Sequence, residues 1–355
     1  MNNDQLAHVC VPTIHIPSRS VAVVGHEWNL YFENVILCDN ILNYDIRCDI
    51  NPAITRWSNF GEFLRITPTA AGVHTVTLSI YNKFSNQPIT SKSFTLNVIE
   101  DKPLADKKVI FLGDSLTYLA YYPVEIQYNL SKGGIQSLGT LSSTTTLNGE
   151  EFTVRHEGRP GWATCHYLME IADNTINPFY NPKAAKFDFS YYMKNQGYTD
   201  VDAVSIFLGT NRIFDTDQAD NIKVMIESIH EYDPDIIVLV NLTPMPASQS
   251  GYGYCHFDYG YPHFANAAYD VKYATTMLVD KYIASFDGVM NNVFVSEVYF
   301  NLDTKRDYGT TKIPASARNT ETEITVQTDS VHPGVVGHLK FADVIYNNLL
   351  YHLTK

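Results

Sequence analysis

The chain has 355 residues, a length that predicts two domains. Its 25 Lys and Arg residues against 38 Asp and Glu residues give a formal charge of −13, so nucleic acid and anionic lipid surfaces are poor partners. Hydrophobic residues make up 45% and charged residues 18%, which excludes general disorder and indicates a folded protein.

The N-terminal residues 1–17 carry no secretory signal that we can identify. They lack a basic stretch followed by an unbroken apolar run, and nowhere does the chain hold about 18 consecutive apolar residues. We therefore expect neither a signal peptide nor a membrane span. The location stays open among the cytoplasm, export by an unrecognised route, and a phage virion that carries the protein in its tail.

Five cysteines are scattered along the chain without the CxxC spacing of zinc ribbons. An odd number in this arrangement argues against a disulfide framework, so we expect buried, reduced thiols. A bridge between Cys38 and Cys48 is the alternative. The sequence holds neither a GxxxxGK[ST] nor a GxGxxG motif, and we predict no cofactor.

Short β runs fill residues 21–98. Several of them alternate apolar and polar side chains with a period of two, and turn residues separate them. The economical architecture for about seven short strands is a β-sandwich, and the segment resembles an immunoglobulin-like or cadherin-like module. The resemblance implies binding of glycans or tethering to a surface. The predicted strands are 29–37, 43–50, 63–66, 73–81 and 91–98.

A polar, charged segment at residues 100–108 contains Pro103 and has the composition of an exposed linker. After it, apolar runs alternate with amphipathic stretches, which predicts βαβ units and a parallel sheet. We therefore predict an all-β domain at 1–103 and an α/β domain at 104–355. In the second domain the predicted strands are 109–112, 203–208, 236–240 and 293–298, and the predicted helices are 219–232, 264–286 and 335–351.

A serine follows directly on the first strand of the α/β domain, in the run Gly113-Asp114-Ser115-Leu116-Thr117. Open α/β sheets hold their sites at the carboxyl edge of parallel strands. A serine there can aim its hydroxyl at a ligand while its own N–H faces developing negative charge, as acyl transfer requires. The simpler alternative is a serine that only caps the following helix.

Two further motifs complete the pattern. A later strand runs into the sequence GTN, which closes with Asn211, and the sequence DSVHP, from Asp329 through His332, precedes the last predicted helix. With Ser115, these residues resemble the SGNH, or GDSL, hydrolases, whose four blocks supply a serine, a glycine, an asparagine and a histidine in this order. The resemblance covers about residues 107–355 and implies a three-layer α/β/α, flavodoxin-like hydrolase domain.

The resemblance also implies a role for each residue. Ser115 would be the nucleophile, and His332 the base that takes its proton. Asp329, three residues before His332, would orient the imidazole and oppose the charge that it acquires. The oxyanion hole would consist of the N–H groups of Ser115 and Gly161 and the side-chain amide of Asn211.

Two positions depart from the family pattern. Related sequences commonly carry an asparagine five residues before the oxyanion glycine, where this chain has His156, and Gly158 competes with Gly161 for that role. The block that contains Asn211 usually continues with an aspartate, whereas this chain continues with Arg212. The asparagine keeps its donor, so the prediction of a hydrolase stands.

Residues 243–263 form an insertion rich in tyrosine. A loop of this length is uncommon and often functional, and aromatic faces suit sugar rings and acyl groups alike. We expect this loop and Trp162 to form the walls of the substrate-binding cleft. His256, Asp258 and His263 in the loop lack metal-ligand spacing, so we predict no metal. The predicted substrate-binding residues are Asp114, Trp162, Tyr252, Tyr254 and Tyr259.

The sequence thus predicts a serine esterase, a carboxylic ester hydrolase that forms an acyl-enzyme on Ser115. The β-sandwich favours removal of acetyl or other short acyl groups from a carbohydrate. Alternatives within the family are a short-chain lipase, a lysophospholipase and a thioesterase, and a different class is a non-catalytic glycan-binding or structural protein of a phage tail. The expected partner is an acylated glycan or another small ester, with attachment to a surface or virion through the N-terminal domain; the oligomeric state stays open.

Overall fold

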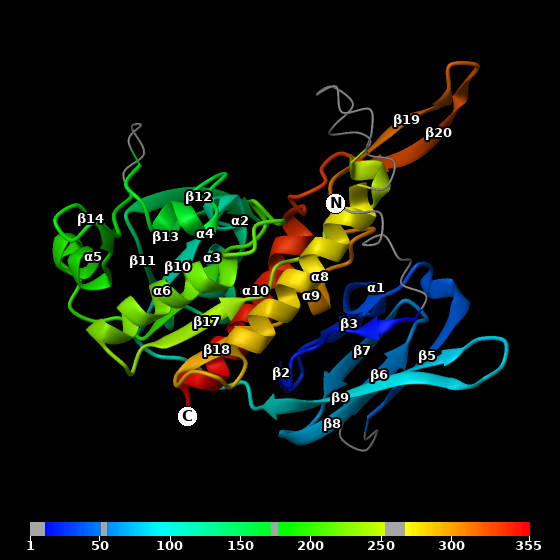
Figure 1. The fold of residues 1–355 in the computed structure, drawn as a ribbon, viewed down its shortest axis with the longest axis horizontal. Coiled ribbons are helices and arrows are strands. Elements are labelled where there is room, and N and C mark those ends of the chain that lie inside the picture. Colours follow the sequence, from blue (N-terminus) through cyan, green and yellow to red (C-terminus); the bar gives the residue numbers. More distant parts are fainter. Residues whose placement is uncertain (1–10, 51–54, 172–176, 253–266) are drawn as a thin grey trace. The chain divides into compact units, whose positions relative to one another are not determined.

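The structure is a computed structural model that describes residues 11–50, 55–171, 177–252 and 267–355. The chain divides into two compact units, whose elements Figure 1 shows. The first unit comprises Met1–Lys102 together with Tyr299–Asn301. The second comprises Pro103–Val298 and Leu302–Lys355.

The first unit is built from β-sheets. Of the strand pairs within its two larger sheets, β2 with β9 is parallel and the others are antiparallel. A third, two-stranded sheet joins β1 (Thr13–Ile14) to β4 (Ile36–Leu37). One of the larger sheets has the strand order β2 (Arg19–Val23), β9 (Pro88–Ile99), β8 (Gly72–Asn82) and β5 (Tyr44–Asp49). The other has the order β3 (Trp28–Tyr31), β7 (Phe63–Pro68) and β6 (Thr55–Asn59).

Apolar side chains from the two larger sheets meet in the core of this unit. The centroid of the Trp28 ring, on β3, lies 6.0 Å from that of Phe94 on β9 and 6.0 Å from that of Phe300. In the centre of β8, buried positions alternate with partly exposed ones, as a period of two predicts. The immunoglobulin-like character of the unit and its tethering role stay predictions.

One predicted strand of this unit is wrong at its centre. The sequence predicts a strand over residues 29–37, whereas the helical turn α1 (Phe32–Val35) separates β3 from β4. Phe32 and Val35 are fully buried, and the Asn34 side-chain amide donates a hydrogen bond to the Tyr299 carbonyl. A short apolar run suits a buried strand and a buried helical turn equally, which explains the difference.

The two cysteines of this unit that the structure describes form no bridge with each other. Cys38 and Cys48 are both buried and are not bridged to each other, and Cys165 of the second unit is half-buried. The alternative of a bridge between Cys38 and Cys48 is therefore wrong. Burial, together with the Asp49 charge, raises the pKa of the Cys48 thiol to about 12. Cys10 and Cys255 lie outside the described residues.

The second unit has a mixed α/β fold around a parallel sheet, which confirms that prediction. From β10 through β16 and β17 to β18 every pairing is parallel, and β11 also pairs in parallel with β10. The strand order is β12 (Leu141–Leu147), β13 (Glu150–Gly158), β10 (Lys107–Gly113), β16 (Ala203–Phe207), β17 (Ile237–Asn241) and β18 (Val293–Ser296), with β11 (Ile135–Leu138) beside β10.

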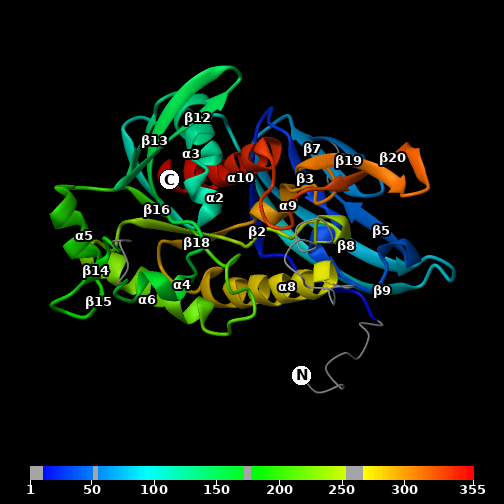
Figure 2. The same ribbon diagram turned by 90° about the horizontal axis from the view of Figure 1, so that it is seen from above.

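Helices cover both faces of this sheet (Figure 2). One face carries α2 (Ser115–Tyr118), α3 (Tyr121–Val124) and α10 (Val335–Leu353), and the other carries α6 (Gln218–Tyr232) and α8 (Ala267–Phe286). Its shorter helices are α4 (Thr164–Tyr167), α5 (Phe189–Gln196) and the π-helical turn η4 (Glu125–Leu130). Of α9 (Val298–Asn301), residues Tyr299–Asn301 belong to the first unit. Among the described residues, no helix is long and apolar enough to cross a membrane.

The sequence predicted the long elements of this unit and missed its two longer antiparallel hairpins, as well as the short pair of β14 (Tyr180–Asn181) and β15 (Lys186–Phe187). Helices α6 and α10 match the predicted ranges 219–232 and 335–351 to within two residues, and α8 starts at Ala267, where the description resumes. One missed hairpin is β12 with β13, and the other is β19 (Thr310–Ser316) with β20 (Asn319–Gln327). Threonine, serine and glutamate dominate these strands, so they show little hydrophobic alternation.

Helix α10 buries a histidine that has no polar partner. His338 is fully buried, and neither of its ring nitrogens has a hydrogen-bond partner among the residues that the structure describes. Its ring packs against those of Tyr121 and Phe341, with centroids 5.5 Å and 5.6 Å away. Burial, together with the charge of the nearby His332, lowers the pKa of His338 to about 3. The folded protein therefore keeps this imidazole neutral.

We expect His338 to make the protein less stable in mild acid. Below pH 6.5 the unfolded chain binds a proton at His338 that the folded chain does not bind. The free energy of unfolding therefore falls by about 1.4 kcal/mol for each pH unit, until the pKa of His338 in the folded protein is reached. Between pH 6.5 and 4.5 this single site should lower the free energy of unfolding by about 2 to 3 kcal/mol. Denaturant unfolding of the wild type and His338→Phe measures it. Equal pH slopes in the two proteins would contradict the assignment.

Candidate active site

The ends of three neighbouring strands meet at one edge of the parallel sheet. Ser115 follows β10, Gly161 follows β13 and Asn211 follows β16, and these strands are adjacent in the order β13, β10, β16. The chain leaves β10 toward β11 on one side and returns as β16 on the other. Such a switch point at the carboxyl ends of strands is where open α/β sheets form sites.

A continuous hydrogen-bonded series joins Ser115, His332 and Asp329. Ser115 Oγ lies 2.9 Å from His332 Nε2, and His332 Nδ1 lies 3.1 Å from Asp329 Oδ2. Because a carboxylate only accepts, Nδ1 carries the hydrogen and Nε2 is left to accept from the serine hydroxyl. The predicted nucleophile, base and orienting carboxylate thus lie in the order that acyl transfer needs.

The loop from Asp329 to His332 is closed by the Asp329 carboxylate itself. Its Oδ1 accepts the backbone N–H groups of Val331 and His332, at 2.7 Å and 2.8 Å. Burial alone would raise the pKa of Asp329, but the hydrogen bonds from the His332 ring and from these N–H groups hold it below its usual value. In turn, the hydrogen bond to Asp329 raises the pKa of His332.

Two segments hold this loop from both sides: residues 307–308, which the sequence did not single out, and the start of the insertion at residues 243–263. The backbone N–H of Gly334 donates to the Asp307 carbonyl at 2.6 Å, and Tyr308 forms a β-bridge with Pro333. On the other side the Ala247 N–H donates to the Ser330 carbonyl at 3.2 Å. These contacts come from loops without any motif, so only the folded chain reveals them.

Gly161 occupies the third position of a tight turn. The Trp162 N–H donates to the Arg159 carbonyl at 3.2 Å, Pro160 stands second, and Gly161 has a φ of 76°. A proline followed by a glycine with positive φ is the signature of a type II turn. Within the described part of the chain, neither the Gly161 N–H nor the Ser115 N–H donates a hydrogen bond. Both donors are available to a ligand.

Gly158, the competing candidate, has its N–H occupied. It donates to His156 Nδ1 at 3.0 Å, and His156 Nε2 lies 2.8 Å from Ser143 Oγ. Burial lowers the pKa of His156 to about 4, so the ring stays neutral and accepts through Nδ1. A Cβ at Gly158 would also lie 2.4 Å from the Tyr118 nitrogen, so the glycine permits close packing of β13 on α2. These contacts favour Gly161 as the oxyanion donor.

The Asn211 amide is held between two acceptors. Its Nδ2 donates to the Trp162 carbonyl at 3.0 Å and to Asp114 Oδ2 at 3.3 Å. Asp114 is fully buried, and its Oδ1 accepts the Leu116 N–H at 2.9 Å, so Asp114 rather than Ser115 caps α2. Burial raises the pKa of Asp114 to about 7, against the lowering effects of the Leu116 N–H and of His332.

The predicted substrate-binding residues lie in different surroundings. Asp114 is fully buried behind Asn211, and Trp162 is 8% exposed, with its ring 4.9 Å from that of Tyr167. Tyr252 is 5% exposed, at the point where the insertion approaches the Asp329 loop, since a Cβ at Gly251 would lie 2.6 Å from the Asp329 carbonyl oxygen. Tyr254 and Tyr259 lie outside the described residues, so the role of the insertion stays a prediction.

No group of three or more His, Cys, Asp or Glu side chains suited to a metal ion occurs where the structure describes the chain. His256, Asp258 and His263 lie outside that part. The groups brought together at the sheet edge are a hydroxyl, an imidazole, a carboxylate and several N–H donors. This set of groups suits nucleophilic attack on a carbonyl and stabilisation of the resulting anion.

No protein-family model matches the chain, and no curated protein matches its sequence. Among solved structures, a carbohydrate esterase family 3 protein from Talaromyces cellulolyticus is 17% identical, with a TM-score of 0.41, and the match covers 70% of this chain and 98% of that one. A family 3 carbohydrate esterase from Clostridium thermocellum is 15% identical, with a TM-score of 0.42 and coverage of 70% and 97%. Both likenesses concern the fold alone.

Proposed function

We propose that the protein is a serine ester hydrolase with Ser115 as the nucleophile. The observation that carries this proposal is the hydrogen-bonded series of Ser115, His332 and Asp329 at the carboxyl edge of the sheet. As Oγ attacks the ester carbonyl, His332 Nε2 takes its proton and then gives it to the leaving alcohol. A water molecule then gives its proton to the same nitrogen and attacks the acyl carbonyl, and His332 passes this proton to the departing Ser115 oxygen as the acid is released.

Three donors are available for the negative charge that develops on the carbonyl oxygen: the Ser115 N–H, the Gly161 N–H and Asn211 Nδ2. The longer of the two Asn211 contacts, 3.3 Å to Asp114, is the one that the oxyanion would replace. With a pKa of about 7, Asp114 is partly neutral near physiological pH, which weakens it as a competing acceptor.

For the substrate, we propose a short acyl ester of a carbohydrate. The rim directly after Asn211 exposes Arg212, Phe214 and Asp215, with Phe214 63% exposed. An exposed ring beside charged groups suits a sugar, whose C–H face packs on the ring while its hydroxyls bond the charges. The charge of −13 disfavours docking on anionic lipid.

A series of p-nitrophenyl acetate, butyrate and octanoate, with acetate release from an acetylated oligosaccharide, tests this proposal. We expect turnover to fall as the acyl chain lengthens. Phe214→Ala should raise KM for the oligosaccharide several-fold and leave the acetate ester unaffected, and Tyr273→Ala, an exposed aromatic on α8, is the matched control. Preference for octanoate would favour the lipase alternative. No turnover and no fluorophosphonate label on Ser115 would favour the binding-only alternative.

Replacing Asn211 should weaken catalysis more than substrate binding. We expect Asn211→Ala to lower kcat by about 10²-fold to 10³-fold, because one oxyanion donor is lost and the Trp162 carbonyl loses its partner. Steady-state kinetics on p-nitrophenyl acetate measure the change. Asn129→Ala, an exposed asparagine on η4, should behave as the wild type. A change of less than twofold in Asn211→Ala with the fold intact would remove this residue from the site.

A further inference from the structure

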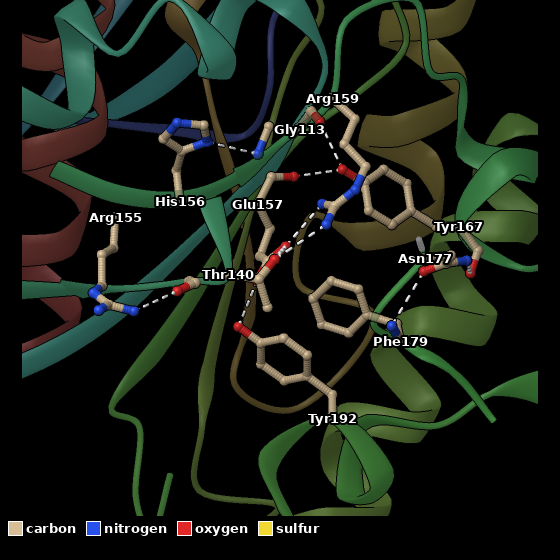
Figure 3. A network of polar contacts seen from close by, with 12 residues as sticks. Gly113, Thr140, Arg155, His156, Glu157, Arg159, Tyr167, Asn177, Phe179 and Tyr192 are labelled. Atoms are coloured by element: carbon tan, nitrogen blue, oxygen red, sulfur yellow. Dashed lines mark hydrogen bonds and ion pairs between the residues drawn. The ribbon is translucent and has the colours of Figure 1, made fainter. Parts of the chain in front are cut away.

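A buried ion pair lies directly behind the turn that presents Gly161. Arg159 Nη1 lies 2.7 Å from Glu157 Oε2, and the two side chains are 5% and 0% exposed. Glu157 is the penultimate residue of β13 and Arg159 is the first residue of the turn, so the pair flanks Gly158. Figure 3 shows the carboxylate and the guanidinium facing each other within a wider polar network.

The Glu157 carboxylate is fixed by partners on both oxygens. Oε1 accepts the Thr140 backbone N–H at 2.6 Å and the Tyr192 hydroxyl at 2.8 Å. Oε2 accepts the Thr140 hydroxyl at 2.9 Å in addition to Arg159. Its partners come from the loop before β12 and from α5, so Glu157 is held in one orientation by elements remote in sequence (Figure 3).

Arg159 connects the fixed Glu157 carboxylate to the residues of the turn. Its Nη2 donates to Thr140 Oγ1 at 3.2 Å, and its backbone N–H donates to the Gly113 carbonyl at 2.9 Å, two residues before Ser115. The centre of its guanidinium lies 5.1 Å from the Trp162 ring centroid. The first and fourth residues of the turn, Arg159 and Trp162, are thereby locked to each other across the Gly161 peptide.

Trp162 extends the connection to a second donor. Its carbonyl accepts Asn211 Nδ2 at 3.0 Å, while its ring packs on Tyr167, whose hydroxyl donates to the Gly113 carbonyl at 2.7 Å. A displacement of Trp162 would therefore move the Gly161 N–H and the Asn211 amide together. Both are groups that the proposed oxyanion hole requires.

We propose that the Glu157–Arg159 pair is the positioning element of the oxyanion hole. It touches no substrate and acts through Trp162 on Gly161 and Asn211. A buried ion pair adds little net stability compared with apolar side chains of the same size, whereas an oxyanion hole needs donors fixed to within a fraction of an ångström. This role rests on the proposed ester hydrolase function.

Removal of both charges tests the role without leaving one of them unpaired in the interior. The double variant Glu157→Gln/Arg159→Met does this, and Arg159→Lys keeps the charge while losing the planar group over Trp162. The matched control is Lys107→Met/Asp202→Asn, which removes a 2.7 Å ion pair at the amino end of β10. The measurements are kcat and KM on p-nitrophenyl acetate per site labelled by fluorophosphonate, the inhibition constant of phenylboronic acid, and the pH profile.

For the double variant we expect kcat per labelled site to fall by about 10-fold to 100-fold with KM nearly unchanged, because the donors are misplaced. Boronic acid, which forms a tetrahedral adduct on serine, should bind more weakly by a similar factor. The acid limb of the pH profile should not move, since His332 and Asp329 are untouched. Arg159→Lys should lose less, and the control should match the wild type.

Normal kcat per labelled site in the double variant would overturn the positioning role, as would a fall in kcat with unchanged boronic acid affinity. If the double variant does not fold, Arg159→Lys decides: lowered kcat at constant KM supports the role, and wild-type kcat overturns it. A wild type with neither turnover nor label overturns the proposed function and this role together. Active wild type with unaffected variants overturns this role alone.

Discussion

Ser115→Ala should lower kcat on p-nitrophenyl acetate by about 10⁵-fold to 10⁶-fold, because no acyl-enzyme can form without the hydroxyl. The substitution removes one partly exposed oxygen that contacts His332 at 2.9 Å, so the fold and KM should change little. The loss is expected to be the largest of any single substitution. It would establish covalent catalysis rather than general base attack by water.

Two further measurements make the result specific. A fluorophosphonate should label the wild type once and should not label Ser115→Ala, and a peptide carrying the label should contain residue 115. The exposed serine Ser142 on β12 provides the matched control, since Ser142→Ala should retain full turnover and full labelling. Retained turnover in Ser115→Ala would show that another group attacks the ester, and the proposed mechanism would then be wrong.

Asp329→Asn should lower kcat by about 10⁴-fold while leaving the loop intact. The new side-chain oxygen can still accept the N–H groups of Val331 and His332, which Asp329 Oδ1 accepts now. The amide, however, donates toward His332 Nδ1 and so stabilises the tautomer in which Nε2 carries the hydrogen. That tautomer cannot take the Ser115 proton, which is the reason for the large effect.

The pH profile separates this effect from a loss of folding. The base must be neutral to act, so activity falls as pH falls through the pKa of His332, which Asp329 raises above its ordinary value of 6.5. In Asp329→Asn the acid limb should therefore move to lower pH. Asp270→Asn, an exposed aspartate on α8, should leave both kcat and the limb in place. If the acid limb of Asp329→Asn stays where it is in the wild type, Asp329 does not raise the pKa of His332.

The residues proposed for catalysis could be predicted because short-range rules place them. Ser115 and Asn211 follow apolar strands, and neighbouring parallel strands end at the same edge of a sheet. Asp329 and His332 are three residues apart, close enough for one loop to join their side chains. In each case a short stretch of sequence contains both the reactive side chain and the strand end or loop that positions it.

The choice between Gly158 and Gly161 needed the folded chain. Both glycines occur in one six-residue stretch, and the decisive contact is the hydrogen bond from the Gly158 N–H to the His156 ring. This imidazole uses one nitrogen on Gly158 and the other on Ser143. Ser143 belongs to β12, a strand that the sequence analysis did not find, so the role of His156 could not be foreseen.

The Glu157–Arg159 pair was unpredictable for a different reason. Charged residues are almost never fully buried unless they are paired, so a sequence analysis places them on the surface by default. The partners of Glu157 lie 17 and 35 residues away, at Thr140 and Tyr192, and neither belongs to a motif. Interactions of this separation depend on how the sheet and α5 come together rather than on any local pattern.

The proposed nucleophile and its base come from opposite ends of the second unit: Ser115 follows its first strand, and His332, 217 positions later, precedes its last helix. During synthesis, domains fold as their residues emerge from the ribosome, and contacts between distant positions form late. The growing chain thus carries an unactivated serine until α10 has been made. Under the proposed mechanism, a product of premature termination before Asp329 lacks the base and should be hydrolytically inert, so activity would report that translation had passed His332.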